Sequence, residues 1–192
     1  MLAGSKSFCS GITAVAERLN DAIPASEPMR SLPKPLLPGL APRFAVTALA
    51  SWQDVETSLR DLAWGDDAMT YCHCLGLQRV LAARNGAFQL QRLEFPNSGE
   101  LISCTAGRLA RRLQSRLELG ASSLQAALSH WLIPRHAAHL QANIECGRIV
   151  LWVQVFDHDD ERRACHRLLP ISCDTVGVHD LIGDEVAACR SA

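Results

Sequence analysis

The densest group of metal-capable side chains in the sequence is Cys72-His73-Cys74. Thiolate and imidazole are ligands for zinc and for softer metals. Successive side chains of a strand point to opposite faces, however, so His73 would lie across the sheet from the two thiols. No second Cys-x-Cys pair occurs to complete a site. Burial of Cys72 and Cys74 as small apolar side chains is the simpler interpretation.

Two histidines, His136 and His139, lie three residues apart in a segment with helical spacing. Side chains at this spacing share one helix face, as in metal sites that add a carboxylate. The next carboxylate along the segment is Glu145, more than a turn away. A surface or capping role is the simpler interpretation. A metal- or redox-responsive protein using Cys72 and Cys74, with a histidine from this segment, is the alternative.

Histidines also stand beside acidic residues, at His158 and at His179-Asp180. A histidine acts as a catalytic base only when a nucleophile or polarising group faces it, and no Ser or Cys has a recognisable nucleophile context. The sequence has no phosphate-cradling glycine loop, no dinucleotide fingerprint and no Cys-x-x-Cys pair. Residues 157–161 suit a helix start, where negative charge is favoured. We therefore expect a protein that is not an enzyme and needs no cofactor.

Four arginines occupy one helical segment: Arg108, Arg111, Arg112 and Arg116. A solvated helix side is the usual reason for such a pattern, and a surface that contacts phosphate groups or an acidic partner is the alternative. The whole chain has 19 basic and 20 acidic residues and a formal net charge of -1. Bulk charge therefore gives no strong nucleic-acid signal and no reason to expect an anionic membrane surface.

Composition predicts a globular chain with one domain and appendages. Of its 192 residues, 48% are hydrophobic, which is enough for a substantial core. Eight cysteines without a secretory apolar run at the N-terminus are typical of reduced thiols, so we expect a cytoplasmic protein. No stretch approaches the roughly 18 to 20 apolar residues that a transmembrane segment needs.

The elements that would position these residues follow two similar patterns. Residues 147–181 predict a β-branched and aromatic strand, a helix with an acidic start and a short strand. Residues 44–75 predict the same order, with Ser51 as the helix N-cap and Gly65 as its stop. Two such β-α-β units favour an α+β fold, a ferredoxin-like antiparallel sandwich with both helices on one face of the sheet.

A largely helical insertion at about 97–146 separates the two units within a domain that spans 44–181. Apolar residues between 106 and 132 predict either one long helix or two shorter ones that meet near Gly120. Pro134 is expected to start a further helix.

The remaining segments lie at the chain ends and before the insertion. Residues 88–95 alternate like an added strand. Residues 1–43 are expected to form an N-terminal helix followed by a proline-rich linker, and residues 182–192 a tail.

The C-terminal part, from Trp131 to Asp180, resembles uncharacterised bacterial proteins related to general-stress-type ferredoxin-like domains. The resemblance lies in a helix that ends at Gly147, the strand Gly-Arg-Ile-Val-Leu-Trp-Val and the closing Val176-Gly-Val-His-Asp. It implies the fold above and a stress-related regulatory or interaction role, and it supports fold more than function. Many members carry a glycine-rich hydrophobic hairpin between the halves; here the equivalent stretch is rich in Arg and Leu, which argues against membrane association.

The strand at 149–155 has two different faces. Alternation puts Trp152 opposite the aliphatic set Ile149, Leu151, Val153 and Val155. The aliphatic face suits the two helices, so Trp152 should be covered by the insertion or by a second subunit. We therefore expect an interaction module that forms a homo-oligomer or binds a protein partner, with Trp152 and the four arginines as its surface.

Overall fold

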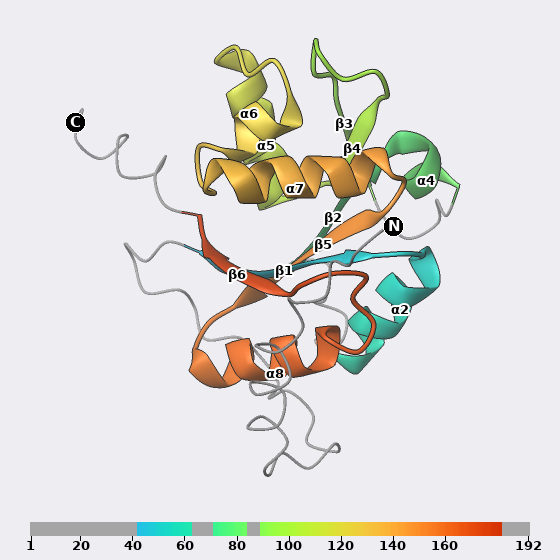
Figure 1. Ribbon diagram of the computed structural model, residues 1–192, viewed down its shortest axis with the longest axis vertical. Helices are drawn as coiled ribbons and strands as arrows, with labels where there is room; N and C mark the ends of the chain where they lie inside the picture. The colour runs from blue at the N-terminus through green and yellow to red at the C-terminus, as the bar shows by residue number, and fades with distance from the viewer. Residues whose placement is uncertain (1–41, 63–70, 84–88, 182–192) are drawn as a thin grey trace, which may run out of the picture.

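The computed structural model describes residues 42–62, 71–83 and 89–181, which build an α+β structure around one sheet (Figure 1). The expected N-terminal helix, the linker up to residue 41, the tail at 182–192 and the predicted stop at Gly65 lie outside these residues. Within the described ranges, no helix combines the length and hydropathy needed to cross a membrane.

One antiparallel sheet holds the six described strands in the spatial order β3-β4-β2-β5-β1-β6. Along the chain the strands are β1 (Arg43–Leu49), β2 (Cys72–Leu77), β3 (Leu90–Leu93), β4 (Ile102–Thr105), β5 (Ile149–Val155) and β6 (Gly177–Asp180). The order places β5 between β1 and β2, and β1 between β5 and β6. The first predicted β-α-β unit contributes β1 and β2, and the second contributes β5 and β6. The two units interleave, because β2 lies beyond β5 and β6 lies beyond β1.

Helices cover both faces of this sheet. The described helices are α2 (Trp52–Asp61), α4 (Gln78–Ala82), α5 (Arg108–Glu118), α6 (Leu124–Leu128), α7 (Pro134–Glu145) and α8 (His158–Leu168). Helices α2 and α8 lie on one face, and α5, α6 and α7 on the other (Figure 1). The two faces have separate hydrophobic clusters, so the core has two layers.

Side-chain caps start α2 and α8 where the sequence predicted. The Ser51 hydroxyl accepts from the Asp54 amide at 3.2 Å, and the Asp54 carboxylate accepts from the Ser51 amide at 3.0 Å, which completes a capping box. In α8, the Asp157 carboxylate accepts from the Asp160 amide at 2.8 Å. These caps satisfy amides that have no partner inside the helix.

Of the two alternatives for residues 106–132, the pair of helices is correct. Helix α5 ends before Gly120, whose φ of +92° is a left-handed conformation that favours glycine. The Ala121 amide donates to the Arg116 carbonyl at 2.9 Å, which closes the helix end and turns the chain toward α6. Pro134 is in the first turn of α7, as predicted.

The insertion at 97–146 is less helical than expected, because it contains β4. This strand pairs with β2 through Leu77 and Ile102, and with β3 through Leu93 and Ile102, so the sheet has two strands beyond the β-α-β units. The added strand predicted at 88–95 is confirmed as β3 in its central part. Four residues give too short an alternation for β4 to be recognised from the sequence.

The predicted division of β5 is confirmed. Ile149, Leu151, Val153 and Val155 belong to the cluster beneath α2 and α8. Trp152 is 0% exposed and belongs to the opposite cluster with Leu109 and Leu113 of α5. The insertion rather than a second subunit therefore covers this tryptophan. The prediction that Trp152 belongs to an interaction surface is therefore wrong, because its side chain is buried within the chain.

Core substitutions on the two faces of β5 should have distinguishable effects. Leu151→Ala is expected to lower the free energy of unfolding by about 2 to 5 kcal/mol, and Trp152→Ala by about 3 to 5 kcal/mol, because each leaves a cavity. Urea unfolding measures both losses. Limited proteolysis should cleave within residues 106–146 faster only in the Trp152 variant, and equal cleavage of both variants would contradict this two-layer packing.

Candidate functional site

His73 is a histidine buried in the sheet face that the insertion covers. It is 1% exposed, lies opposite Trp152 in the β2–β5 register, and its ring centroid is 6.2 Å from that of Phe44. Neither ring nitrogen has a hydrogen-bond partner in the described part of the chain. A neutral imidazole carries one donor and one acceptor, and an unpaired buried polar group costs about 1 to 3 kcal/mol. His73 is therefore an unsatisfied polar group at the centre of the fold.

Gly107 is in contact with the His73 ring. It is the N-cap residue of α5 and has φ of +148° and ψ of -159°, a backbone region that essentially only glycine adopts. A Cβ atom at this position would lie 2.6 Å from Cε1 of His73. Glycine is required here for two independent reasons, and its absent side chain lets the imidazole reach the start of the helix.

The N-terminus of α5 has no side chain that caps it. Gly107 offers no side-chain acceptor, and the first turn contains no acidic residue. The first amides of a helix have no carbonyl partner within it and carry the positive end of the helix dipole. Arg108 is half-buried and Arg111 is exposed, and neither forms an ion pair with a described residue. This helix end is strongly electropositive.

That environment disfavours the protonated form of His73. Burial, followed by the nearby positive charges of Arg108 and Arg111, lowers the pKa of His73 from 6.5 to about 4. The imidazole is therefore neutral at physiological pH and can donate one hydrogen bond.

The four predicted arginines do not form one surface. Arg112 is 9% exposed, and its Nη1 donates to the Leu181 carbonyl at 2.9 Å, so it ties α5 to the segment after β6. The Arg116 guanidinium lies 5.9 Å from the Trp131 ring centroid in a cation–π contact. The prediction that Arg112 belongs to the interaction surface is therefore wrong. Arg108 and Arg111 remain accessible beside His73.

The candidate metal residues Cys72, Cys74, His136 and His139 are not brought together. Cys72 and Cys74 are buried in the cluster beneath α2 and α8, whereas both histidines belong to α7 on the other side of the sheet. Burial raises the pKa of both thiols, that of Cys74 to about 12, so they are protonated. Within the described ranges no three His, Cys, Asp or Glu side chains gather with metal-site geometry.

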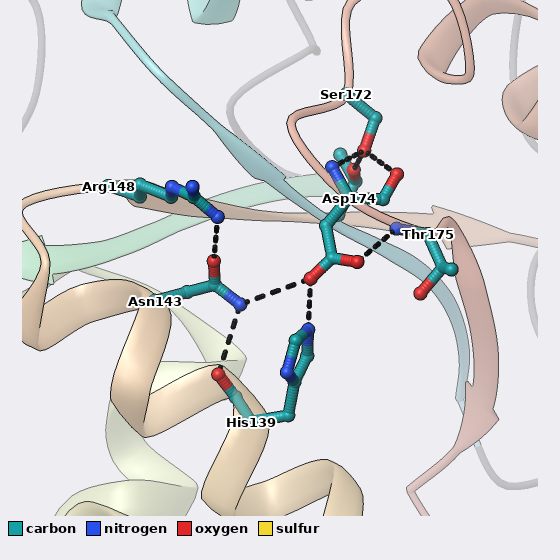
Figure 2. Close-up of polar contacts among 7 residues, drawn as sticks. His139, Asn143, Arg148, Ser172, Asp174 and Thr175 are labelled. Carbon is teal, nitrogen blue, oxygen red and sulfur yellow. Dashed lines mark hydrogen bonds and ion pairs between the residues drawn. The ribbon is translucent and has the colours of Figure 1, made fainter. Parts of the chain in front are cut away.

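His139 has a carboxylate partner, Asp174, which lies 35 residues away and which sequence spacing does not indicate. Figure 2 shows His139 Nε2 against Asp174 Oδ2, from the turn that precedes β6. Asn143 Nδ2 donates to the His139 carbonyl at 3.0 Å and to Asp174 Oδ2 at 3.4 Å. Arg148 Nη1 donates to Asn143 Oδ1 at 2.7 Å. This polar cluster fastens α7 to the loop between α8 and β6.

Ser172 completes the residue types of a hydrolase triad in this cluster, but the geometry is different. The Ser172 hydroxyl forms a hydrogen bond of 2.5 Å with the Thr47 hydroxyl. It also donates to the Asp174 carbonyl at 2.5 Å and accepts from the Asp174 amide at 3.1 Å. Among the described residues this hydroxyl has no hydrogen bond to His139, so the arrangement lacks the serine–base contact of a triad (Figure 2). Partial burial raises the pKa of Asp174, but its bonds to the Thr175 amide and to His139 outweigh this and the pKa lies below its ordinary value. The cluster is therefore a structural tether.

Gly107→Ala should destabilise the protein. Strained backbone alone costs about 1 to 3 kcal/mol, and the new Cβ would also displace the His73 ring. Chemical denaturation measures the loss. The matched control is Gly99→Ala, because Gly99 has no atom within 4 Å of the added Cβ. Adding His73→Ala to Gly107→Ala should recover part of the loss, and an effect as small as that of Gly99→Ala would refute the close contact.

The buried His73 should make stability depend on pH. Its pKa is about 4 in the folded chain and 6.5 when unfolded, so its stabilising contribution is complete above pH 6.5 and is lost as pH falls toward 4. Over that range the loss should reach about 3 kcal/mol. Urea unfolding at several pH values in phosphate-free buffer should give a shallower slope for His73→Gln than for the wild type. Parallel slopes would contradict the shifted pKa.

Comparisons with known proteins add no counterpart for this arrangement. No protein-family model matches the chain, and searches of curated proteins and of solved structures give no match. The likeness of residues 131–180 to general-stress-type domains therefore stays an expectation from the sequence.

Proposed function

We propose that the chain is a non-enzymatic interaction module that self-associates through the edge of β6. We also propose that β2, β5, β1 and β6, with α2 and α8, form a ferredoxin-like unit to which β3, β4 and the other helices are added. The spatial order of these four strands supports this, because two interleaved β-α-β units with antiparallel neighbours generate it. A stress-related role rests on the resemblance of the C-terminal part alone.

The open edge of β6 carries this proposal. Helices cover both sheet faces, so partners can extend the described sheet only at β3 or β6. The β3 edge has charged Arg92 and Glu94 and is followed by Pro96, which are common protections against pairing. β6 has neither proline nor lysine, and its outer edge has no partner in the described ranges. Unpaired strand amides and carbonyls are a template for another strand.

A second copy of β6 fits this edge without charge conflict. In an antiparallel pair centred between Val178 and His179, Gly177 would face Asp180 of the other copy, and Val178 would face its His179. No two like charges oppose each other, and Arg43 already lies 3.5 Å from the Asp180 carboxylate. The His136 ring packs on His179 of β6. Ile133, three residues before His136, is 52% exposed, so its side chain would add apolar area beside the paired β6 strands.

The catalytic and thiol-based alternatives receive less support. The Ser172 hydroxyl lacks a bonded base among the described residues, and Cys72 and Cys74 are buried and protonated. Metal or redox responsiveness would require these thiols to be exposed first, and no contact in the described structure favours that.

Proline substitutions at two adjacent β6 positions test self-association. Successive amides of a strand point to opposite edges, so one of Val178→Pro and His179→Pro removes an outward amide and the other an amide that faces β1. The outward variant should keep the wild-type melting temperature but raise the dimer dissociation constant at least about tenfold, because pairing bonds are lost. Sedimentation velocity over micromolar concentrations gives the dissociation constants.

The inward variant is the matched control, since it should lower thermal stability as well. Two results would refute the proposal: a wild-type protein that stays monomeric at the highest concentration, or a dimer whose affinity neither substitution changes. A dimer that persists in both variants would point to a different surface.

A further inference from the structure

The geometry around His73 points to a second function, and the argument for it does not rest on the proposed self-association. We propose that the N-terminus of α5 binds the phosphate group of a small molecule, held by the first amides of the helix, Arg108 and Arg111, with the His73 imidazole as a further donor.

Two independent observations support this site. The first is the uncapped, acid-free start of an 11-residue helix, where free amides and the helix dipole favour an anion. The second is His73, which is 1% exposed, has both ring nitrogens without a partner in the described residues, and packs directly against Gly107. Buried polar groups of folded proteins nearly always have partners, so an unpaired imidazole beside an electropositive helix end indicates a missing acceptor.

The Gly107 backbone makes this approach possible. A Cβ atom at Gly107 would lie only 2.6 Å from Cε1 of His73. Any side chain at this position would therefore push the imidazole away from the helix start. Gly107 has a strained, glycine-only conformation, whereas an N-cap with a side-chain acceptor, such as Ser51 in α2, stabilises a helix start. Close approach of backbone to a bound phosphate is a common reason for such a glycine.

The arrangement of charge favours one phosphate group over a nucleic-acid backbone. Arg112 is bonded to the Leu181 carbonyl and Arg116 is stacked on Trp131, so the arginines do not form a continuous stripe. Arg108 and Arg111 stand alone at one end of α5. A site that follows a polymer needs several spaced cations along a groove, whereas two arginines and a helix end suit a single phosphate.

Binding is tested with inorganic phosphate as the probe and the full chain as the protein. The backbone amide signals of Gly107, Arg108 and Leu109 should shift in a saturable way in nitrogen-15 NMR spectra, with a dissociation constant in the millimolar range or below. The melting temperature should rise with phosphate over the same range, because the ligand binds only the folded state.

The informative variant is Arg108→Gln, and Arg162→Gln on α8 is its matched control. Both substitutions remove one positive charge. Arg162, however, forms its ion pair with Asp159 within α8, and α8 lies on the other side of the sheet from α5. Arg108→Gln should weaken phosphate binding at least about tenfold, while Arg162→Gln should leave it unchanged. His73→Gln should also weaken binding, and if this core variant does not fold, Arg108→Gln decides alone.

Three results would overturn the proposal. One is the absence of saturable shifts at the three α5 amides with millimolar phosphate. Another is equal weakening by Arg108→Gln and Arg162→Gln, which would mean unspecific electrostatic attraction. The third is a single-stranded oligonucleotide that binds at α5 with steep salt dependence when inorganic phosphate does not, which would assign the site to nucleic acid instead.

Discussion

The structure depends on one constraint: β5 is buried on both faces. All seven residues from Ile149 to Val155 are buried, so apolar cover is needed above and below the same strand. Helices α2 and α8 supply one layer, and the insertion supplies the other with α5, α6 and α7 (Figure 1). A strand buried on one face only would have left the insertion free to be an appendage. Because Trp152 faces the insertion, that segment is instead half of the hydrophobic core.

The same constraint determines where polar groups become costly. Alternation along β2 sends Cys72 and Cys74 into one layer, where thiols pack as small apolar groups, and His73 into the other. An imidazole cannot pack as an apolar group in the same way, because either neutral tautomer keeps one hydrogen-bond donor and one acceptor. Two of the unsatisfied groups in the described chain, the His73 imidazole and the Trp152 indole, are neighbours on this face, and His73 also contacts Gly107 at an uncapped helix end. By contrast, the side chains of His139, Asn143 and Asp174 are hydrogen-bonded to one another (Figure 2).

Local patterns predicted much of the fold, and their success has a physical basis. The Ser51 and Asp157 caps, the break at Gly120 and the two faces of β5 each depend on residues close in sequence. What escaped prediction depends on distant contacts. The four residues of β4 form a strand because they pair with β2, which is distant in sequence. Asp174 contacts His139 although the two residues are 35 positions apart. The arginine pattern was visible, but only the fold separates Arg112, which is buried and hydrogen-bonded to a backbone carbonyl, from Arg111, which is exposed.

Helix α5 connects the two regions to which functions are proposed. Its N-cap residue Gly107 packs on His73, and about one turn into the helix Arg112 donates to the Leu181 carbonyl, directly after β6. An anion at the helix start and a strand paired with β6 would therefore act on the same rigid element from two sides. Thermodynamic linkage then sets a condition on both. If phosphate changes the affinity of one copy for another by some factor, self-association must change the affinity for phosphate by that same factor. A factor of one would mean that the two binding events are energetically independent, although α5 lies between them.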